Sequence, residues 1–178
     1  MYSDTASLTR LERHLFALVV AATLLFALIT PPFQAPDENQ HYMKALLLSE
    51  GGMLAQARGP LIGADLPRAA IDLHDVDFPT DTPGATQVYS LDMLQHAWNA
   101  DVTRPGRTFA DFPNVANYAP SLYAPGAAGL MIGDAIGLPR LGAFYAGRIV
   151  NALVALGLIL LALRLLPFGR MALLGVTL

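Results

Sequence analysis

Long apolar segments constrain this chain of 178 residues more than any other feature. The first runs from Leu15 to Thr30 and can be extended by Phe33, and another runs from Leu141 to Leu166. A helix needs about 20 apolar residues to cross the hydrocarbon core of a membrane, and these segments have about that length. The composition, with 54% hydrophobic and 14% charged residues, also indicates a membrane protein.

The fold class predicted from these segments is an all-α membrane protein with about three transmembrane helices and the start of a fourth. A long extracytoplasmic loop would contain short juxtamembrane helices. The expected segments are a cytoplasmic leader at 1–14, spans at 15–33, 119–138 and 141–166, a loop domain at 34–118, and the start of a truncated span at 171–178. A cleaved signal peptide is the alternative for the first span, but residues 30–33 lack a small-residue cleavage site.

The distribution of charge sets the expected orientation. Arg10 and Arg13 precede the first span, which keeps the N-terminus in the cytoplasm, and residues 31–118 carry eleven acids against five bases. Three spans would then place the stretch 164–170 outside, although its two arginines argue against that. The chain has no basic run that would indicate nucleic-acid binding, and without cysteine it can form no disulfide or thiolate metal site.

Intramembrane charges are expected to find partners. A turn near Pro139 would bring Asp134 and Arg148 to a similar depth on adjacent antiparallel helices. We therefore predict that these two side chains meet, with Arg140 as the competing partner for the aspartate. Gly129, Gly133 and Gly137 form a small-xxx-small pattern that predicts close helix packing rather than phosphate binding.

Two short helices are predicted inside the loop domain. The first covers Glu38 to Ser49, since Asp37 can cap its start after a proline and Gly51 and Gly52 follow its end. Its apolar centre favours a place along the membrane interface or against other helices. The second covers Tyr89 to Ala100, and prolines and glycines make the rest of the loop irregular.

The acids that follow the first span are the leading candidates for chemistry. In a helix that starts at Glu38, the side chains of Glu38 and His41 share a face, and Asp37 lies one turn from His41. A carboxylate there can accept a proton or hold a divalent cation. The alternative is structural: Asp37 caps the helix, Glu38 complements the helix dipole, and His41 is a solvated neighbour.

Three motifs carry a resemblance to a known family. They are P-P-F-Q-x-P-D-E-x-x-H-Y from Pro31, Y-x-P-x-x-Y-x-P from Tyr118, and G-R-I-V-N-A-L at 147–153. In this order, over residues 11–178, the chain resembles a family of bacterial multi-spanning membrane proteins of unknown function. That family is similar to the GT-C class of glycosyltransferases, which use sugars linked to a polyprenyl phosphate.

The resemblance implies a function and a location. The chain would be the N-terminal part of an enzyme of the bacterial inner membrane that transfers a sugar from a polyprenyl-phosphate donor to a cell-envelope acceptor. Asp37 or Glu38 would be the catalytic carboxylate that serves the acceptor or would hold a divalent cation, and His41, Tyr118 and Tyr123 would bind substrate. The partners would be the lipid bilayer, the lipid-linked sugar and further C-terminal transmembrane helices that this sequence lacks.

Other interpretations stay open. The chain can instead be a non-catalytic membrane-anchored scaffold or subunit, or an inactive gene remnant, whose outer loop binds a partner, and a transporter is disfavoured because the apolar segments carry few polar groups at mid-depth. The two tyrosines at 118 and 123 also suit an aromatic belt. Weaker candidates for a cation site are Asp72, His74, Asp75 and Asp77, whose spacing matches no defined motif. Tyr89 and Trp98 suit a sugar platform less well than the apolar side of a short helix.

Overall fold

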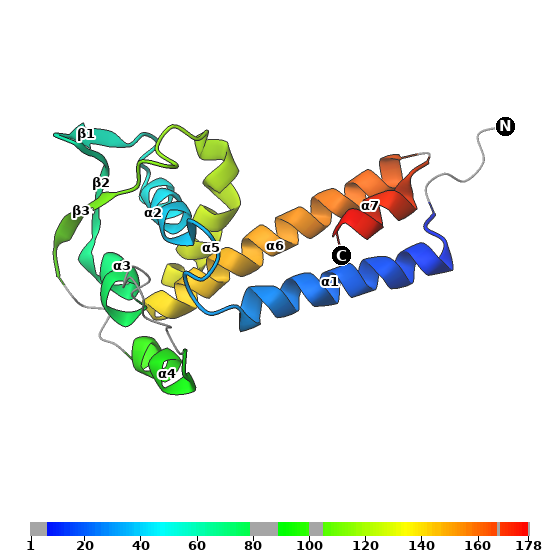
Figure 1. The fold of residues 1–178 in the computed structure, drawn as a ribbon, viewed down its shortest axis with the longest axis horizontal. Coiled ribbons are helices and arrows are strands. Elements are labelled where there is room, and N and C mark those ends of the chain that lie inside the picture. The colour runs from blue at the N-terminus through cyan, green and yellow to red at the C-terminus, as the bar shows by residue number, and fades with distance from the viewer. Residues whose placement is uncertain (1–6, 79–88, 100–104, 167, 178) are drawn as a thin grey trace. The chain divides into compact units, whose positions relative to one another are not determined.

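The structure, a computed structural model, describes residues 7–78, 89–99, 105–166 and 168–177. The chain divides into two compact units. Unit 1 consists of Met1–Ile29 together with Asn151–Leu178, and unit 2 consists of Thr30–Val150. The ribbon in Figure 1 follows the chain through both units, and each is described separately below.

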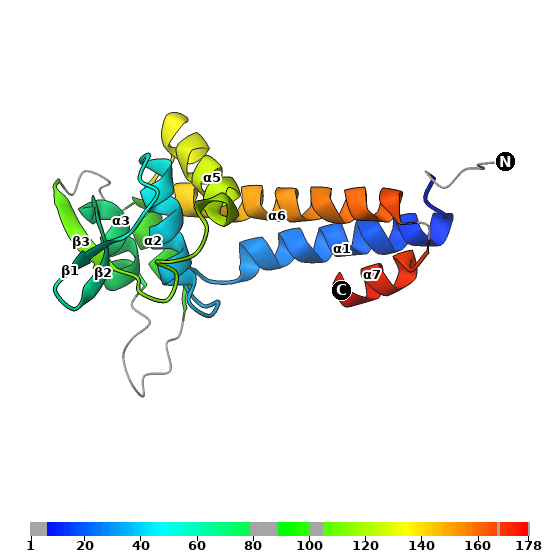
Figure 2. The ribbon, with the colours of Figure 1, turned by 90° about the horizontal axis from the view of Figure 1, so that it is seen from above.

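Unit 1 is built from apolar helices. It contains α1 (Arg10–Ile29), the C-terminal part of α6 (Arg140–Leu165), and α7 (Arg170–Thr177). These helices lie side by side in Figures 1 and 2. Their shared core is formed by Val19, Leu156, Leu163 and Leu174.

Within the described residues, α1 and α6 are the two helices that are long and apolar enough to cross a membrane. Many of their large side chains remain exposed, including Leu18, Phe26, Leu158 and Leu161. Exposed apolar surface of this extent is typical of a face that contacts lipid. The prediction of a membrane protein is confirmed at this level by the two candidate spans.

The helix α1 begins at Arg10, five residues before the predicted start of the span. Its first turn is closed by a capping box between Thr9 and Glu12. The Thr9 amide donates to the Glu12 carboxylate at 2.8 Å, and the Glu12 amide donates to the Thr9 hydroxyl at 3.2 Å. This reciprocal pair satisfies two amides that would otherwise lack partners in the first turn of the helix.

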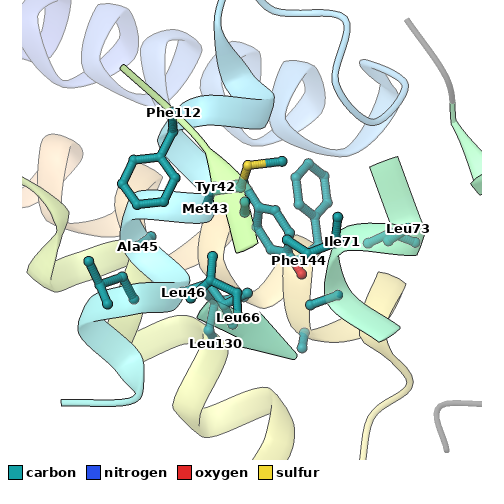
Figure 3. Packing of buried hydrophobic residues seen from close by; sticks show 14 of the residues in the cluster. Tyr42, Met43, Ala45, Leu46, Leu66, Ile71, Leu73, Phe112, Leu130 and Phe144 are labelled. Atoms are coloured by element: carbon teal, nitrogen blue, oxygen red, sulfur yellow. The ribbon is translucent and has the colours of Figure 1, made fainter. Parts of the chain in front are cut away.

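The centre of unit 2 is α2 (Glu38–Ser49), which has the predicted bounds. It lies between a small sheet and α5 (Ala124–Ala135) in both views of the ribbon (Figures 1 and 2). Its side chains are buried on nearly all sides from Tyr42 to Leu47. Figure 3 shows Tyr42, Met43 and Leu46 among Leu66, Leu130 and Phe144 in this core. The apolar centre of this helix is therefore explained by packing on its neighbours.

A three-stranded antiparallel sheet covers one side of α2 and was not predicted from the sequence. Its strands are β1 (Gln56–Arg58), β2 (Leu61–Pro67) and β3 (Arg107–Asp111), in the order β1-β2-β3. The register pairs Ala64 with Ala110. The fold class is therefore mostly helical but not all-α. A Cβ at Gly63 would lie 1.7 Å from the Ala110 carbonyl oxygen, so only glycine fits there. The absence of a side chain at Gly63 therefore allows the two strands to pair closely.

Short helical elements complete the middle of unit 2. After β2 come α3 (Arg68–Asp72) and a π-helical turn, η1 (Leu73–Asp77). The predicted helix at 89–100 is confirmed as α4 (Leu91–Asn99), and residue 100 lies outside the described part of the chain.

The predicted span at 119–138 is not confirmed. The structure has a short 3₁₀ turn, η2 (Pro120–Tyr123), followed by α5 with 12 residues. At 1.5 Å per residue α5 is about 18 Å long, which is shorter than the hydrocarbon core of a membrane. The chain leaves α5 at Gly137, whose φ of +75° suits the C-terminal end of a helix.

The predicted glycine packing is confirmed at two of the three glycines. Added Cβ atoms would lie 2.5 Å from the Ala146 carbonyl oxygen at Gly129 and 2.7 Å from the Ala143 Cα at Gly133. Both glycines therefore let α5 approach the N-terminal part of α6 closely. Gly137 has nothing within 4 Å of such a Cβ, so it ends the helix and does not extend the packing surface.

Candidate functional site

The turn between α1 and α2 has an unusual backbone. Phe33 has a φ of 62° and Asp37 a φ of 56°, and these are the two non-glycine residues with positive φ in the part of the chain that the structure describes. Such a conformation is rare for a bulky aromatic residue and better tolerated by aspartate. Phe33 is held by ring contacts with Tyr42, His74 and Phe144, at centroid distances of 4.8 to 5.6 Å. Packing in unit 2 thus fixes a turn that local preferences disfavour.

Asp37 does not cap α2, so the predicted capping role is wrong. The side chain makes no capping hydrogen bond, because the positive φ turns it away from the first-turn amides. Its Oδ1 instead accepts a hydrogen bond from Asn114 Nδ2 at 3.3 Å, and the residue is exposed. Its backbone carbonyl accepts the His41 amide at 3.0 Å. An exposed carboxylate is therefore presented at the start of the helix.

Glu38 has the opposite environment, since its carboxylate is bound by Arg148 of α6. Arg148 Nε donates to Oε1 at 2.7 Å and a terminal nitrogen donates to Oε2 at 2.6 Å. Arg148 also donates to the carbonyls of Thr30 at 2.5 Å and Pro31 at 3.0 Å. The two charged side chains are 11% and 16% exposed. Bidentate pairing of this kind is strong and directional, so Glu38 anchors the turn to α6.

These contacts correct the predicted pairing of Asp134 with Arg148. Asp134 is bound by Arg140, with Nη1 at 2.9 and 3.0 Å from the two carboxylate oxygens. The connection between α5 and α6 is so short that the first residue of α6 lies beside the last turn of α5. Arg148 lies two turns further along α6, where it contacts the start of α2 instead.

His41, Tyr118 and Tyr123, which the sequence placed together as substrate-binding candidates, are neighbours in the structure. His41 Nδ1 lies 3.0 Å from the Tyr123 hydroxyl, and the two rings stack at 5.8 Å. The Tyr118 ring lies 6.4 Å from that of His41 and is half exposed. Burial raises the pKa of Tyr123, with a smaller contribution from Tyr118, so its hydroxyl keeps its proton at neutral pH.

Two further polar residues join this group and were missed from the sequence. The Asn114 amide donates to Gln40 Oε1 at 3.0 Å, while its side chain reaches Asp37. Asn114 thus ties the segment before η2 to the first turn of α2. We define the α2 site as Asp37, Gln40, His41, Asn114, Tyr118 and Tyr123. No sequence pattern indicates a role for Asn114 in a site. Gln40 is distinguished from other polar residues only by its position beside His41.

The α2 site combines groups suited to proton transfer and to binding. Asp37 offers an exposed carboxylate, His41 an imidazole, and Tyr118 an aromatic face on which a sugar can stack. A divalent cation takes six or more oxygen ligands, or about six in the case of magnesium. Within the described residues no group of three or more His, Asp or Glu side chains is arranged to hold a metal. The α2 site contains one carboxylate, that of Asp37, since Glu38 is bound by Arg148.

Three of the weaker candidates, His74, Tyr89 and Trp98, make contacts with other side chains or helices of unit 2. His74 is buried, with Nδ1 at 2.7 Å from Asp75 Oδ1 and its ring edge against Phe33. Tyr89 stacks on Phe78 and its hydroxyl accepts a hydrogen bond from Gln34. The Trp98 ring lies against Gly142 of α6, where a Cβ would approach it to 3.1 Å.

Two candidate spans, α1 and α6, with residues 30–139 between them in the sequence, are typical of an integral membrane protein. The chain belongs to the family described as Predicted membrane protein (DUF2142), whose model matches residues 20–178. Neither a curated protein nor a solved structure matches the chain.

Proposed function

We propose that this chain forms the N-terminal part of a glycosyltransferase of the bacterial inner membrane, which transfers a sugar from a polyprenyl-phosphate donor to a cell-envelope acceptor. The observation that carries the proposal is the contrast between two adjacent acids. Glu38 is neutralised by Arg148, whereas Asp37 is exposed on a strained turn beside His41 and Asn114. Strained backbone held in place by packing is frequent at functional sites.

Asp37 has the chemistry that the transfer requires. An acceptor hydroxyl attacks the anomeric carbon, the bond from that carbon to the phosphate oxygen breaks with its electron pair, and the hydroxyl proton needs a base. Asp37 is that base, and it gains the proton as the new glycosidic bond forms. His41 and Tyr118 hold the acceptor, and Glu38 with Arg148 keeps the turn in place.

The proposed orientation places the α2 site outside the cytoplasm, where lipid-linked donors of this type are used. The start of α1 carries Arg10 and Arg13, and Arg164 and Arg170 follow the apolar stretch of α6. Arg170 lies 3.8 Å from Glu12 and donates to the Ser7 carbonyl at 3.4 Å, so these basic ends meet within unit 1. Both ends then lie in the cytoplasm in accordance with the positive-inside rule.

The proposal is tested by Asp37→Asn in the complete reading frame. Asparagine also tolerates a positive φ and can accept the hydrogen bond from Asn114, but it cannot take a proton. Transfer of radiolabel from a polyprenyl-phosphate sugar into envelope material should fall by a factor on the order of a hundred in isolated membranes. Asp92→Asn, at an exposed position in α4, is the matched control and should keep full activity.

The non-catalytic alternative makes a different prediction for the same variant. If unit 2 is a scaffold that binds a partner, Asp37→Asn leaves transfer unchanged at normal membrane levels. Exposed apolar side chains on unit 2, such as Leu122 at 69% and Ile136 at 68%, favour this second candidate. Full transfer in Asp37→Asn would overturn the catalytic proposal and support the scaffold.

A further inference from the structure

The helix α5 is apolar on all sides. Asp134 is the one charged residue among its 12, and the carboxylate is bound by Arg140. One face of the helix is buried within unit 2 and consists of small residues and one leucine: Gly126, Ala127, Gly129, Leu130 and Gly133. Helices that are hydrophobic all round are found where every face meets an apolar environment. The second face of α5 therefore also needs an apolar environment.

This second face is left exposed by the described part of the chain. Met131 is 56% and Ile132 is 51% exposed, and three alanines beside them are exposed as well. We define the outer face of α5 as these five residues: Ala124, Ala128, Met131, Ile132 and Ala135. With 3.6 residues per turn they form one stripe along the helix, and none of them has a polar side chain. A helix that faced water would carry polar or charged residues along this stripe.

The packing of α5 on α6 indicates the level at which the outer face lies. Gly129 and Gly133 lie against residues 143–147 of α6. A helix crosses the hydrocarbon core of a membrane with about 20 residues, and 20 residues counted back from Arg164 reach to about residue 144. The level of α5 is therefore the boundary between the hydrocarbon core and the headgroups for a membrane crossed by α6.

We propose that the outer face of α5 contacts lipid at this boundary, so that α5 is an interfacial helix that enters the membrane surface without crossing it. Helices of this kind bury an apolar face about 5–10 Å into the boundary between headgroups and acyl chains. Lipid is the favoured occupant because exposed apolar side chains continue along the candidate span. Leu153 and Val154 follow about two turns beyond the contact with α5 and are 54% and 41% exposed. This inference goes beyond the proposed glycosyl transfer and does not depend on Asp37.

The test uses spin labels on the full chain in phosphatidylcholine liposomes. Because the chain has no cysteine, Met131→Cys and Ile132→Cys each carry a single label. Electron paramagnetic resonance then measures collisions of the label with oxygen, which concentrates in lipid, and with a nickel chelate that stays in water. Leu158→Cys, at an exposed position of α6, is the lipid control, and Asp92→Cys, at an exposed position of α4, is the water control. The ratio of oxygen to nickel collisions at positions 131 and 132 should be several times that at position 92.

Two results would overturn the proposal. A collision ratio equal to that at position 92 would place the outer face in water. Few collisions with either reagent would show that a protein partner or a second copy of the chain covers the face, as the scaffold alternative requires. Unchanged midpoints of thermal unfolding show that a labelled variant keeps its fold, and either of the two positions alone decides. Asp37→Asn should leave both ratios unchanged, so failure of the catalytic proposal is distinguishable from failure of this one.

Discussion

Asp37 and Glu38 are neighbours in the sequence, but their side chains differ in what each can do. The sequence showed that an acidic pair follows the first span, and it left open which member acts. In the structure the two acids are distinguished by Arg148, which lies 110 residues after Glu38 and binds it. No local pattern indicates a contact over such a separation. The same applies to Asn114, which lies 77 residues from Asp37.

Replacing Glu38 should destabilise the protein, whereas replacing Asp37 should not. Glu38→Gln removes the charge that compensates Arg148, and breaking a largely buried ion pair costs about 3–5 kcal/mol in the free energy of unfolding. Asp37→Asn keeps a side chain that tolerates positive φ and should be nearly neutral. Thermal unfolding in detergent compares the two variants. Equal unfolding temperatures would show that the ion pair does not anchor the turn.

Lys44 should make the stability depend on pH in the alkaline range. It is 1% exposed and donates to the carbonyls of Ala116 at 2.9 Å and Met53 at 3.3 Å. Burial lowers its pKa below the usual 10.5, so the folded state releases the proton at a lower pH than the unfolded state does. The contribution of Lys44 to stability therefore rises with pH from its folded pKa up to about 10.5.

The comparison with Lys44→Met isolates this effect. Tyrosines also titrate at high pH, and burial raises the pKa of Tyr89 and Tyr123, which gives the opposite slope above pH 10. The difference in unfolding free energy between wild type and Lys44→Met removes these common contributions. It should shift in favour of the wild type as the pH rises toward about 10. A constant difference over this range would contradict the lowered pKa.

Among the helices and strands, the sequence predicted those whose ends depend on neighbouring residues and missed those that depend on pairing with distant segments. The helix at 38–49 was predicted with its observed bounds, because Pro36 precedes it and Gly51 and Gly52 follow it. The sheet was missed because β2 pairs with β3 across more than 40 residues, and the β2 segment contains glycine, aspartate and proline, which are poor strand formers. The earlier start of α1 was readable from the pattern Thr9-x-x-Glu12 and was overlooked.

The contact between α5 and α6 provides a matched pair of glycine substitutions. Gly129→Ala would place a Cβ 2.5 Å from the Ala146 carbonyl oxygen, so the helices must separate, at a cost of about 1–3 kcal/mol. Gly157→Ala in α6 meets nothing within 4 Å and should be neutral or stabilise the helix by up to about 1 kcal/mol. The midpoint temperature of thermal unfolding should fall for the first variant only. Equal midpoints would show that α5 does not pack closely on α6.

For the whole molecule, the number of spans decides which side each loop faces. Three spans would place residues 164–170 outside, against the charge rule, and two spans place them with the N-terminus. In the structure α5 is too short for the additional span, and α1 and α6 remain as candidates. An arrangement in which only α1 and α6 span would agree with the charge rule at Arg164 and Arg170.

Cysteine labelling distinguishes the two topologies, because the chain has no cysteine of its own. Asp75→Cys reports on unit 2, and Phe168→Cys reports on the segment after α6, where Phe168 is 81% exposed. In intact spheroplasts an impermeant thiol reagent should label position 75, and position 168 only after lysis. Labelling of both positions in intact cells would restore the three-span arrangement. Labelling of position 168 alone would reverse the orientation.

The anchoring of the turn by Arg148 also has a consequence for biosynthesis. Glu38 leaves the ribosome 110 residues before its partner, which at roughly 5–20 residues per second is a delay of about 5 to 20 seconds. During this time the carbonyls of Thr30 and Pro31 lack the donors that Arg148 supplies later. Until Arg148 is synthesised, the Glu38 carboxylate at the end of the first helix lacks this partner. The turn is completed once α6, which carries Arg148, has been synthesised.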